Sequence, residues 1–358
     1  MTKYKVCVYA ICKNEEKFVK RWVASMKEAD AIYVLDTGST DDTVSKLKKL
    51  GVHVKKKVVK PWRFDVARNE SLKLLPKDTD ICVCTDLDEV FEPGWRDKLE
   101  TLWNDSITRL RYNYNWSFDQ YGNPAVNFYI DKIHRLDGYR WTHPVHEVLS
   151  YDKGPEHVIF TDEITLNHYP DSKKSRSGYL PLLELSVKED PTDDRNMHYL
   201  GREYMFYGKW NEAIDTLIRH LHLPKATWKD ERCASMRFIA RCYQQLKRFD
   251  EARMWLDKAM MEAPYLRDPF VERAILEYLL GNWKEVEHYC LKALNITVKT
   301  KSYINETFSW DYSIYDLLSL SYYYQQKKDL ALKYVDLALE MNPDDDRLKE
   351  NKKLIQAL

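Results

Sequence analysis

The sequence predicts two domains of different class: an N-terminal α/β domain with a mostly parallel sheet, and a C-terminal all-α domain of helical repeats. The chain has 358 residues, which is more than one typical domain needs to enclose a core. Its first half alternates short β-branched runs with amphipathic segments. Its second half has a helical pattern with an internal repeat. We therefore expect one domain over residues 1–178 and another over residues 179–358.

Strand and helix patterns alternate through the first half in a regular order. Strands are expected over residues 3–12, 30–36, 52–59 and 80–86, and helices over residues 14–29, 40–51 and 64–75. Within the first helix, Phe18, Trp22 and Met26 recur every four residues and share one face. This order predicts a parallel sheet covered by helices on both faces, with ligands bound beyond the carboxyl ends of the strands.

Small residues at fixed spacing mark a repeat in the second half. The spacing of Ala252, Ala259 and Pro264, which is 7 and then 5 positions, recurs at residues 331, 338 and 343. Pairs of mostly small residues twelve positions apart accompany it: Gly201 and Ala213, Ala240 and Ala252, Ala274 and Val286, Ser319 and Ala331. Because small side chains let paired helices pack closely, this pattern resembles the tetratricopeptide repeat, in four copies over roughly residues 195–344 followed by a capping helix.

The composition argues against some classes of function. Lys and Arg total 56 and Asp and Glu total 56, so the formal net charge is zero. This balance disfavours a protein held to nucleic acid or to membranes by long-range electrostatics. No apolar stretch is long enough to span a bilayer and no secretory pattern opens the chain, so we expect a cytoplasmic protein. The 7 cysteines include no CxxC pair and are expected to be reduced core thiols.

A cluster of carboxylates follows the last predicted strand, in the stretch CTDLDEVFEPGW. The period of a strand places Asp86 and Asp88 on the same face. Two such oxygen donors suit Mg²⁺ or Mn²⁺, which typically joins few protein ligands to substrate phosphates. A solvated acidic turn is the plain alternative for this motif taken alone.

Further motifs occur in order before and after this cluster. VLDTGSTDDT places Asp36 at a strand end, FDVARNESL supplies Arg68, and HPVHEVL supplies His146 and Glu147. Together with ICKNEEKFVKRWVAS, CTDLDEVF and LNHY, the series resembles the family 2 glycosyltransferases, which are inverting enzymes with the GT-A nucleotide-sugar fold. The likeness is greatest to bacterial members that join this domain to tetratricopeptide repeats.

The resemblance implies a nucleotide site along the strand ends. Ala10, Asn14 and Glu15 would border the nucleotide, with the backbone around Ala10 lining the base pocket. Asp36 would accept a hydrogen bond from the uracil imide or the ribose, and Arg68 would face the base or the diphosphate. The expected donor is a UDP-sugar.

The resemblance also implies a metal and sugar site. Asp86 would contact the ribose or the sugar, and Asp88 would bind the metal, Mn²⁺ or Mg²⁺. His168, in TLNHYPD, would complete the metal site, with a structural histidine as the alternative. The family usually has a small residue at the position of Leu87, so this leucine either points into the core or narrows the sugar slot.

Transfer with inversion needs a base that removes the acceptor's proton. In similar enzymes a His-Glu pair occurs at this place, so Glu147 is the leading candidate base and His146 is its active-site neighbour. Asp119 and Asp162 are lesser candidates, and Glu89 resembles an auxiliary acid.

Two other segments invite a functional interpretation. The polar stretch PDSKKSRSGY is expected to form a flap whose Lys173 and Lys174 reach the diphosphate. The stretch YNYNWSFDQYGNPAVNFY predicts a hairpin that turns at QYGNP, with Tyr112, Tyr114 and Trp116 on one face. These aromatic side chains serve either core packing or an acceptor platform.

The sequence thus predicts a metal-dependent inverting glycosyltransferase, of the hexosyl or N-acetylhexosaminyl class, that uses a nucleotide-sugar donor. The repeats would hold a peptide or protein acceptor, and an oligosaccharide or lipid-linked sugar is the alternative acceptor. A competing interpretation is a repeat scaffold whose transferase half has lost activity. A nucleotidyltransferase is disfavoured, because AICKNEE is acidic where a basic, glycine-rich phosphate loop would stand.

Overall fold

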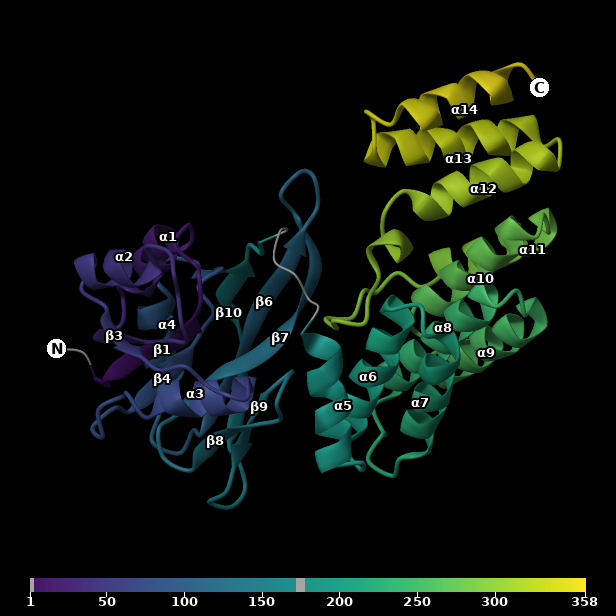
Figure 1. Cartoon of the computed structure of the whole chain (residues 1–358). Helices are drawn as coiled ribbons and strands as arrows, with labels where there is room; N and C mark the ends of the chain where they lie inside the picture. The colour runs from purple at the N-terminus through teal and green to yellow at the C-terminus, as the bar shows by residue number, and fades with distance from the viewer. Residues whose placement is uncertain (1–2, 172–177) are drawn as a thin grey trace. The chain divides into compact units, whose positions relative to one another are not determined.

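The computed structural model describes residues 3–171 and 178–358, which form two compact units (Figure 1). Unit 1 is Met1–Ser186 and unit 2 is Val187–Leu358, and the division falls inside helix α5 (Tyr179–Glu189). All seven cysteines are buried and free, as predicted. Among the described residues, no helix is both long and apolar enough to cross a membrane.

Unit 1 is built on one large twisted sheet with strand order β3-β2-β1-β4-β7-β6-β10-β5. The pairings among β3, β2, β1 and β4 are parallel, as is that of β6 with β10, whereas β7 and β5 run antiparallel to their neighbours. The strands are β1 (Val6–Cys12), β2 (Ala31–Asp36), β3 (His53–Lys56), β4 (Ile81–Cys84), β5 (Glu89–Phe91), β6 (Arg109–Phe118), β7 (Pro124–Arg135) and β10 (Val158–His168). A second, two-stranded sheet pairs β8 (Tyr139–Thr142) with β9 (Val148–Tyr151). The predicted mostly parallel sheet is confirmed.

Helices cover both faces of this sheet, because alternate residues of β1 are apolar on either side. Val8 packs in one cluster with Trp22 of α1 (Val19–Met26) and Leu99 of α4 (Trp95–Leu102). Tyr9 packs on the opposite face with Leu72, the last residue of α3. The remaining bounds are α2 (Thr43–Lys49) and α3 (Phe64–Leu72). The two-faced arrangement predicted from the sequence is therefore confirmed.

Unit 2 is entirely helical, and consecutive helices pack as antiparallel pairs (Figure 1). The helices are α6 (Asp194–Phe206), α7 (Trp210–His222), α8 (Lys229–Gln245), α9 (Phe249–Glu262), α10 (Asp268–Leu279), α11 (Trp283–Leu294), α12 (Ser313–Tyr324), α13 (Lys328–Met341) and α14 (Asp346–Gln356). Each predicted pair of mostly small residues lies buried between two paired helices. At Gly201, an added Cβ would lie 2.5 Å from Leu217 of the partner helix, so only glycine allows this approach. The four predicted copies are confirmed as four helix pairs.

The longest interval in the repeat, residues 295–312, folds back along α8. Ile304 is buried in the cluster formed around α8, and Glu306 pairs with Arg237 at 3.2 Å and with Arg241 at 2.6 Å. The segment contains the short 3₁₀ helix η1 (Thr307–Ser309). Part of the α8 surface is therefore covered by the chain itself.

Candidate active site

The carboxyl ends of β1, β2 and β4 meet at one edge of the large sheet, and several predicted site residues lie there. Asp36 ends β2 opposite Cys12 and is 1% exposed. Its carboxylate accepts the Ser39 backbone N–H at 3.1 Å, and the Cys12 thiol lies 3.7 Å away. Burial, followed by the nearby Asp36 charge, raises the pKa of the Cys12 thiol, which therefore stays protonated.

The loop after β1 is fastened to the loop after β2. Asn14 has a left-handed backbone with φ of 56°, a conformation that asparagine tolerates. Its side-chain oxygen accepts the Thr40 N–H at 2.8 Å, and the Glu15 N–H donates to Thr43 Oγ1 at 2.8 Å. Ala10 is fully buried within β1.

Arg68 joins two other predicted residues, Asp86 and Glu147, into one chain of contacts. Its guanidinium donates to Asp86 Oδ1 at 2.6 Å and to Glu147 Oε1 at 2.9 Å. The Arg68 side chain is 4% exposed, whereas the Asp86 and Glu147 side chains are 36% and 12% exposed. Helix α3, the turn after β4 and the segment before β9 thus bring together residues that are far apart in the sequence.

Lys132 of β7 belongs to the same cluster and was not predicted. Its ammonium donates to Asp86 Oδ2 at 3.1 Å and to Glu89 Oε1 at 3.2 Å. Burial alone would raise the pKa of Asp86, but the charges of Arg68 and Lys132 outweigh it and hold that pKa well below its ordinary value. The positively charged side chains of Arg68, from α3, and Lys132, from β7, therefore offset the negative charges of Asp86 and Glu89, which lie close together in the sequence.

Asp88 turns away from this cluster toward His168, the last residue of β10. The distance between Asp88 Oδ2 and His168 Nε2 is 3.5 Å. His168 Nδ1 lies 3.0 Å from the Trp116 carbonyl oxygen, which can only accept, so Nδ1 carries a proton and Nε2 faces Asp88. One oxygen and one nitrogen at this separation fit two neighbouring ligands of a divalent cation.

The prediction that Asp86 and Asp88 share a strand face is wrong. Strand β4 ends at Cys84, and the Glu89 N–H donates to the Asp86 carbonyl at 3.0 Å, so the chain turns at this point. Leu87 is 2% exposed and packs in the main core, so it does not narrow a sugar slot. The two carboxylates consequently contact different partners: Asp86 pairs with Arg68 and Lys132, and Asp88 lies beside His168.

The lesser base candidates, Asp119 and Asp162, and the predicted auxiliary acid, Glu89, each accept hydrogen bonds from neighbouring groups. The Asp119 carboxylate accepts the backbone N–H groups of Tyr121 and Asn123 at the tip of the β6–β7 hairpin. The Asp162 carboxylate accepts the Tyr129 hydroxyl at 2.8 Å. Glu89 is buried and accepts the Tyr114 hydroxyl at 2.9 Å.

The predicted neighbour His146 and the aromatic hairpin have the following contacts. The His146 ring stacks on Tyr179 with centroids 5.8 Å apart. Tyr112 and Tyr114 are buried, whereas Trp116 is 45% exposed and its ring lies 6.1 Å from that of His168. The predicted turn of the hairpin at QYGNP is confirmed between β6 and β7. Lys173 and Lys174, the flap residues predicted from the sequence, lie outside the described residues.

Comparison with known protein families identifies both units. Residues 7–147 match the glycosyl transferase family 2 model, and residues 238–265 and 312–345 match the tetratricopeptide repeat. The chain therefore combines a region that matches the family 2 glycosyltransferases with a C-terminal region that matches tetratricopeptide repeats. Both assignments agree with the sequence prediction.

Curated relatives and solved structures match parts of the chain. Uncharacterised glycosyltransferases of Rickettsia conorii and Rickettsia typhi are 34% and 33% identical over 99 residues, which is 27% of this chain and 34% and 32% of theirs. The chain thus spans about a third of the length of these relatives. The structure of MamA matches at 18% identity over 48% of this chain and 91% of MamA, with a TM-score of 0.39. A glucosyl-3-phosphoglycerate synthase of Mycobacterium tuberculosis, solved with Mn²⁺ and UDP, matches at 25% identity over 31% of this chain and 44% of that one, with a TM-score of 0.27.

Proposed function

We propose that unit 1 is a metal-dependent inverting glycosyltransferase that takes its sugar from a nucleotide diphosphate, with UDP-sugars as the donors. The observation that carries this proposal is the pairing of Asp88 with His168 beside the Asp86–Arg68–Glu147 chain. These groups lie at the carboxyl edge of the sheet, where ligands of open α/β sheets bind. They would combine a cation site with a carboxylate base, and all of them except His168 lie within the residues that match family 2.

The donor would lie along the edge of the sheet. Asp36 and the loop of Asn14 and Glu15 would hold the base and ribose, and Asp86 with Arg68 would face the sugar and diphosphate. Asp88 and His168 would hold Mn²⁺ or Mg²⁺, which when bound supplies a Lewis acid that stabilises the leaving diphosphate. The Lys132 side chain is 23% exposed and adds positive charge at the same place.

Glu147 is proposed to accept the proton of the acceptor. Its hydrogen bond from Arg68 orients one carboxylate oxygen, and its 12% exposure leaves it reachable from solvent. A glutamine at this position keeps the shape and the hydrogen bond from Arg68 but has almost no basicity. Glu147→Gln should therefore bind UDP like the wild type and lose transfer by about 100- to 10,000-fold.

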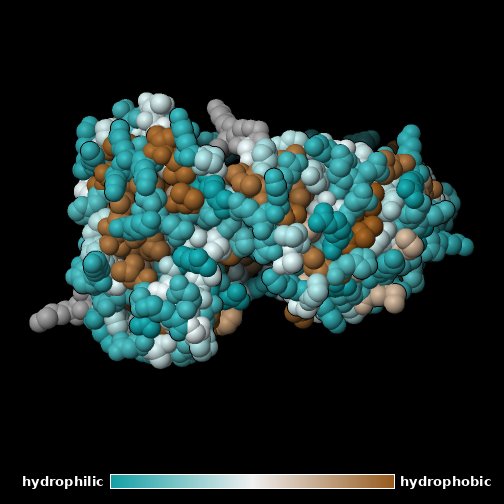
Figure 2. All heavy atoms as spheres, turned by 60° about the horizontal axis from the view of Figure 1, so that its bottom comes forward, coloured by the Kyte–Doolittle hydropathy of each residue, from teal (hydrophilic) through white to brown (hydrophobic). Residues whose placement is uncertain are grey.

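The acceptor is proposed to be a peptide or protein bound by the repeats, with an oligosaccharide or a lipid-linked sugar as the other candidates. Unit 2 exposes the large apolar side chains of Phe206, Trp228, Met261 and Tyr265. Figure 2 shows hydrophobic groups reaching the surface among hydrophilic ones on the face that it draws. Because residues 295–312 cover part of α8, a partner would use the uncovered helices or displace this segment.

The test is the release of UDP from UDP-glucose and from UDP-N-acetylglucosamine in the presence of Mn²⁺. Wild type should release UDP from one of these donors, and Glu147→Gln should release it far more slowly. Glu163→Gln, an exposed change on β10, is the matched control and should keep wild-type turnover. Equal turnover in Glu147→Gln would remove this residue as the base, and absence of UDP binding to the wild type would favour a repeat scaffold without transferase activity.

A further inference from the structure

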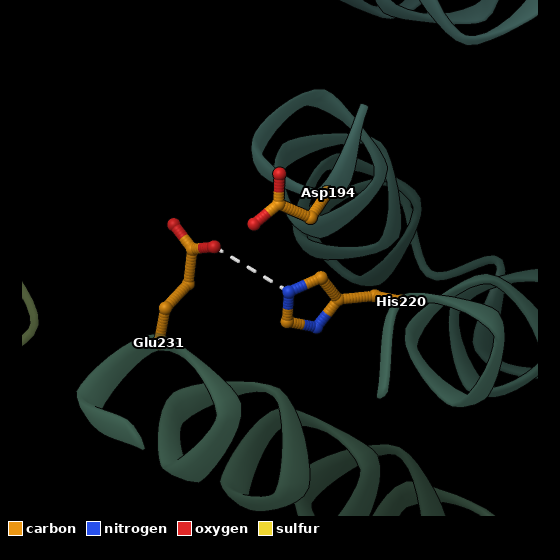
Figure 3. Close-up of side chains that lie close together, drawn as sticks. All are labelled: Asp194, His220 and Glu231. Atoms are coloured by element: carbon orange, nitrogen blue, oxygen red, sulfur yellow. Dashed lines mark ion pairs between the residues drawn. The ribbon is translucent and has the colours of Figure 1, made fainter. Parts of the chain in front are cut away.

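Three helix ends in unit 2 bring two carboxylates and a histidine together, away from the transferase motifs. Asp194 is the first residue of α6, His220 lies in the last turn of α7, and Glu231 lies in the first turn of α8. One possible ligand atom from each residue lies within 4.8 Å of the other two. Figure 3 shows both carboxylates and the imidazole pointing toward one another from three separate helices.

The imidazole of His220 is oriented by a hydrogen bond at one ring nitrogen, Nδ1, as the imidazoles of metal-binding histidines usually are. Its Nδ1 lies 2.9 Å from Ser235 Oγ, and the same hydroxyl lies 2.7 Å from His198 Nδ1. The His220 side chain is fully buried, and within the described part of the chain its Nε2 has no short hydrogen bond, only an ion-pair contact with Glu231 at 3.4 Å. Because buried polar atoms are nearly always satisfied, this nitrogen indicates a missing ligand.

Glu231 is the described partner of that nitrogen, and it contacts it only at long range. Glu231 Oε1 lies 3.4 Å from His220 Nε2, which is longer than the roughly 2.7–3.2 Å of an N–H···O hydrogen bond. The other oxygen, Oε2, accepts the Tyr303 hydroxyl at 2.5 Å. This bond fixes the carboxylate so that Oε1 faces the imidazole, as outer contacts do around bound metal ions.

We propose that Asp194, His220 and Glu231 form a second metal site, which binds Zn²⁺ or a similar divalent transition metal. Zinc ligands at about 2.0–2.2 Å from the ion stand about 3.4 Å apart in a tetrahedral site, and the His220–Glu231 separation is 3.4 Å. An imidazole among the ligands favours such an ion over Mg²⁺ or Ca²⁺. Asp194 is partly exposed and offers a route for the ion from solvent.

The bound ion would tie the ends of α6, α7 and α8 together. Three protein ligands leave a fourth position for water or for an incoming group. The site lies wholly within unit 2 and shares no residue with the Asp88–His168 pair, so it does not depend on the proposed transferase function.

The test is calorimetric titration of Zn²⁺ into the full chain carrying Asp88→Asn, which removes the proposed transferase ligand. This parent should bind one equivalent of Zn²⁺ at the unit 2 site, and its unfolding temperature should rise on binding. Adding His220→Gln or Asp194→Asn should weaken that binding by at least about 100-fold and abolish the rise. Asp194→Asn, at a partly exposed helix start, keeps the test valid if circular dichroism shows that His220→Gln fails to fold.

The matched control is His222→Gln, which changes an exposed histidine on the same helix whose Nδ1 lies 2.7 Å from the Ile218 carbonyl oxygen. It should bind Zn²⁺ like the parent. Absence of Zn²⁺ binding to the parent would overturn the proposal, and so would full affinity in both Asp194→Asn and His220→Gln. The cluster would then be a buried polar contact without a metal.

Discussion

Each unit buries an arginine among carboxylates, and the two arginines differ in what surrounds them. Arg237 of unit 2 is fully buried, and its partners Asp268 and Glu272 are 0% and 5% exposed, at 3.3 and 3.0 Å. Arg68 of unit 1 is 4% exposed, but its partner Asp86 is 36% exposed at the edge of the sheet. The two networks therefore differ in how far the partner carboxylates are exposed to solvent.

The neighbours of the two arginines sharpen this difference. Glu306 closes the Arg237 network from the folded-back segment, at 3.2 Å. Beside Arg68, by contrast, Asp88 faces a histidine whose ring geometry suits metal binding. We infer that the first network stabilises the repeats and that the second positions a ligand site.

The largest expected effect is that of Arg68→Met. Removing one partner of a buried ion pair leaves an uncompensated charge and costs about 3–5 kcal/mol of folding free energy. Because Arg68 also holds Asp86 and Glu147, we expect UDP affinity to fall by about 100-fold as well.

The matched control for this prediction is Arg237→Met, which should lose a similar folding free energy in unit 2 and keep its UDP affinity. Hydrogen exchange of peptides from each unit measures the first quantity and calorimetry the second. Loss of UDP affinity in both variants would break the distinction between the networks.

A smaller effect is expected from Gly201→Ala, which tests the packing of the first helix pair. The new Cβ would lie 2.5 Å from Leu217 Cγ, so α6 and α7 would have to separate. Overpacking of this kind costs about 1–3 kcal/mol. Gly178→Ala, where nothing lies within 4 Å of an added Cβ, should change stability little. Urea unfolding followed by circular dichroism compares the two variants, and equal stability would contradict the packing argument.

The smallest effect concerns acid. Burial alone would raise the pKa of Glu277, but hydrogen bonds from Arg253, Asn282 and Arg273 outweigh it and lower that pKa from 4.5 to about 2. A carboxyl whose pKa is lower in the folded state stabilises the fold above its unfolded pKa, and this contribution is lost as pH falls. Between about pH 4.5 and pH 2, wild type should therefore lose more unfolding free energy than Glu277→Gln.

The control is Glu285→Gln, a change at an exposed position, which should follow the wild type in urea titrations at each pH. Parallel pH curves for wild type and Glu277→Gln would show that these hydrogen bonds do not lower the pKa.

Features that depend on local periodicity could be predicted from the sequence. Residues that recur every four positions located the buried face of α1, and small residues twelve positions apart located the helix pairs of unit 2. Asp36, Arg68 and Asp88 could be proposed as site residues because each stands in a short motif, Asp36 at the end of β2 and Arg68 within α3. Their separate partners were not predicted in any detail.

Features that depend on long-range pairing could not be predicted. Lys132 reaches Asp86 only because β7 pairs antiparallel with β4, in a register that sets Ile133 opposite Val83. The one signal available for this contact was that Lys132 is a basic residue on a strand beside the acidic turn. Asp86 and Asp88 were placed on one face because the strand period was extended past Cys84, where the turn closed by the Glu89 N–H ends it. The cluster of Asp194, His220 and Glu231 depends on three helix ends meeting, which no single motif encodes.

The account is tested most directly by calorimetric titration of UDP, with and without Mn²⁺, into the wild type and into Asp88→Asn. We predict that the wild type binds UDP much more tightly with Mn²⁺ and that Asp88→Asn loses this dependence. The same Mn²⁺-dependent affinity in Asp88→Asn would contradict the central claim that Asp88 and His168 hold the metal of a nucleotide-sugar site.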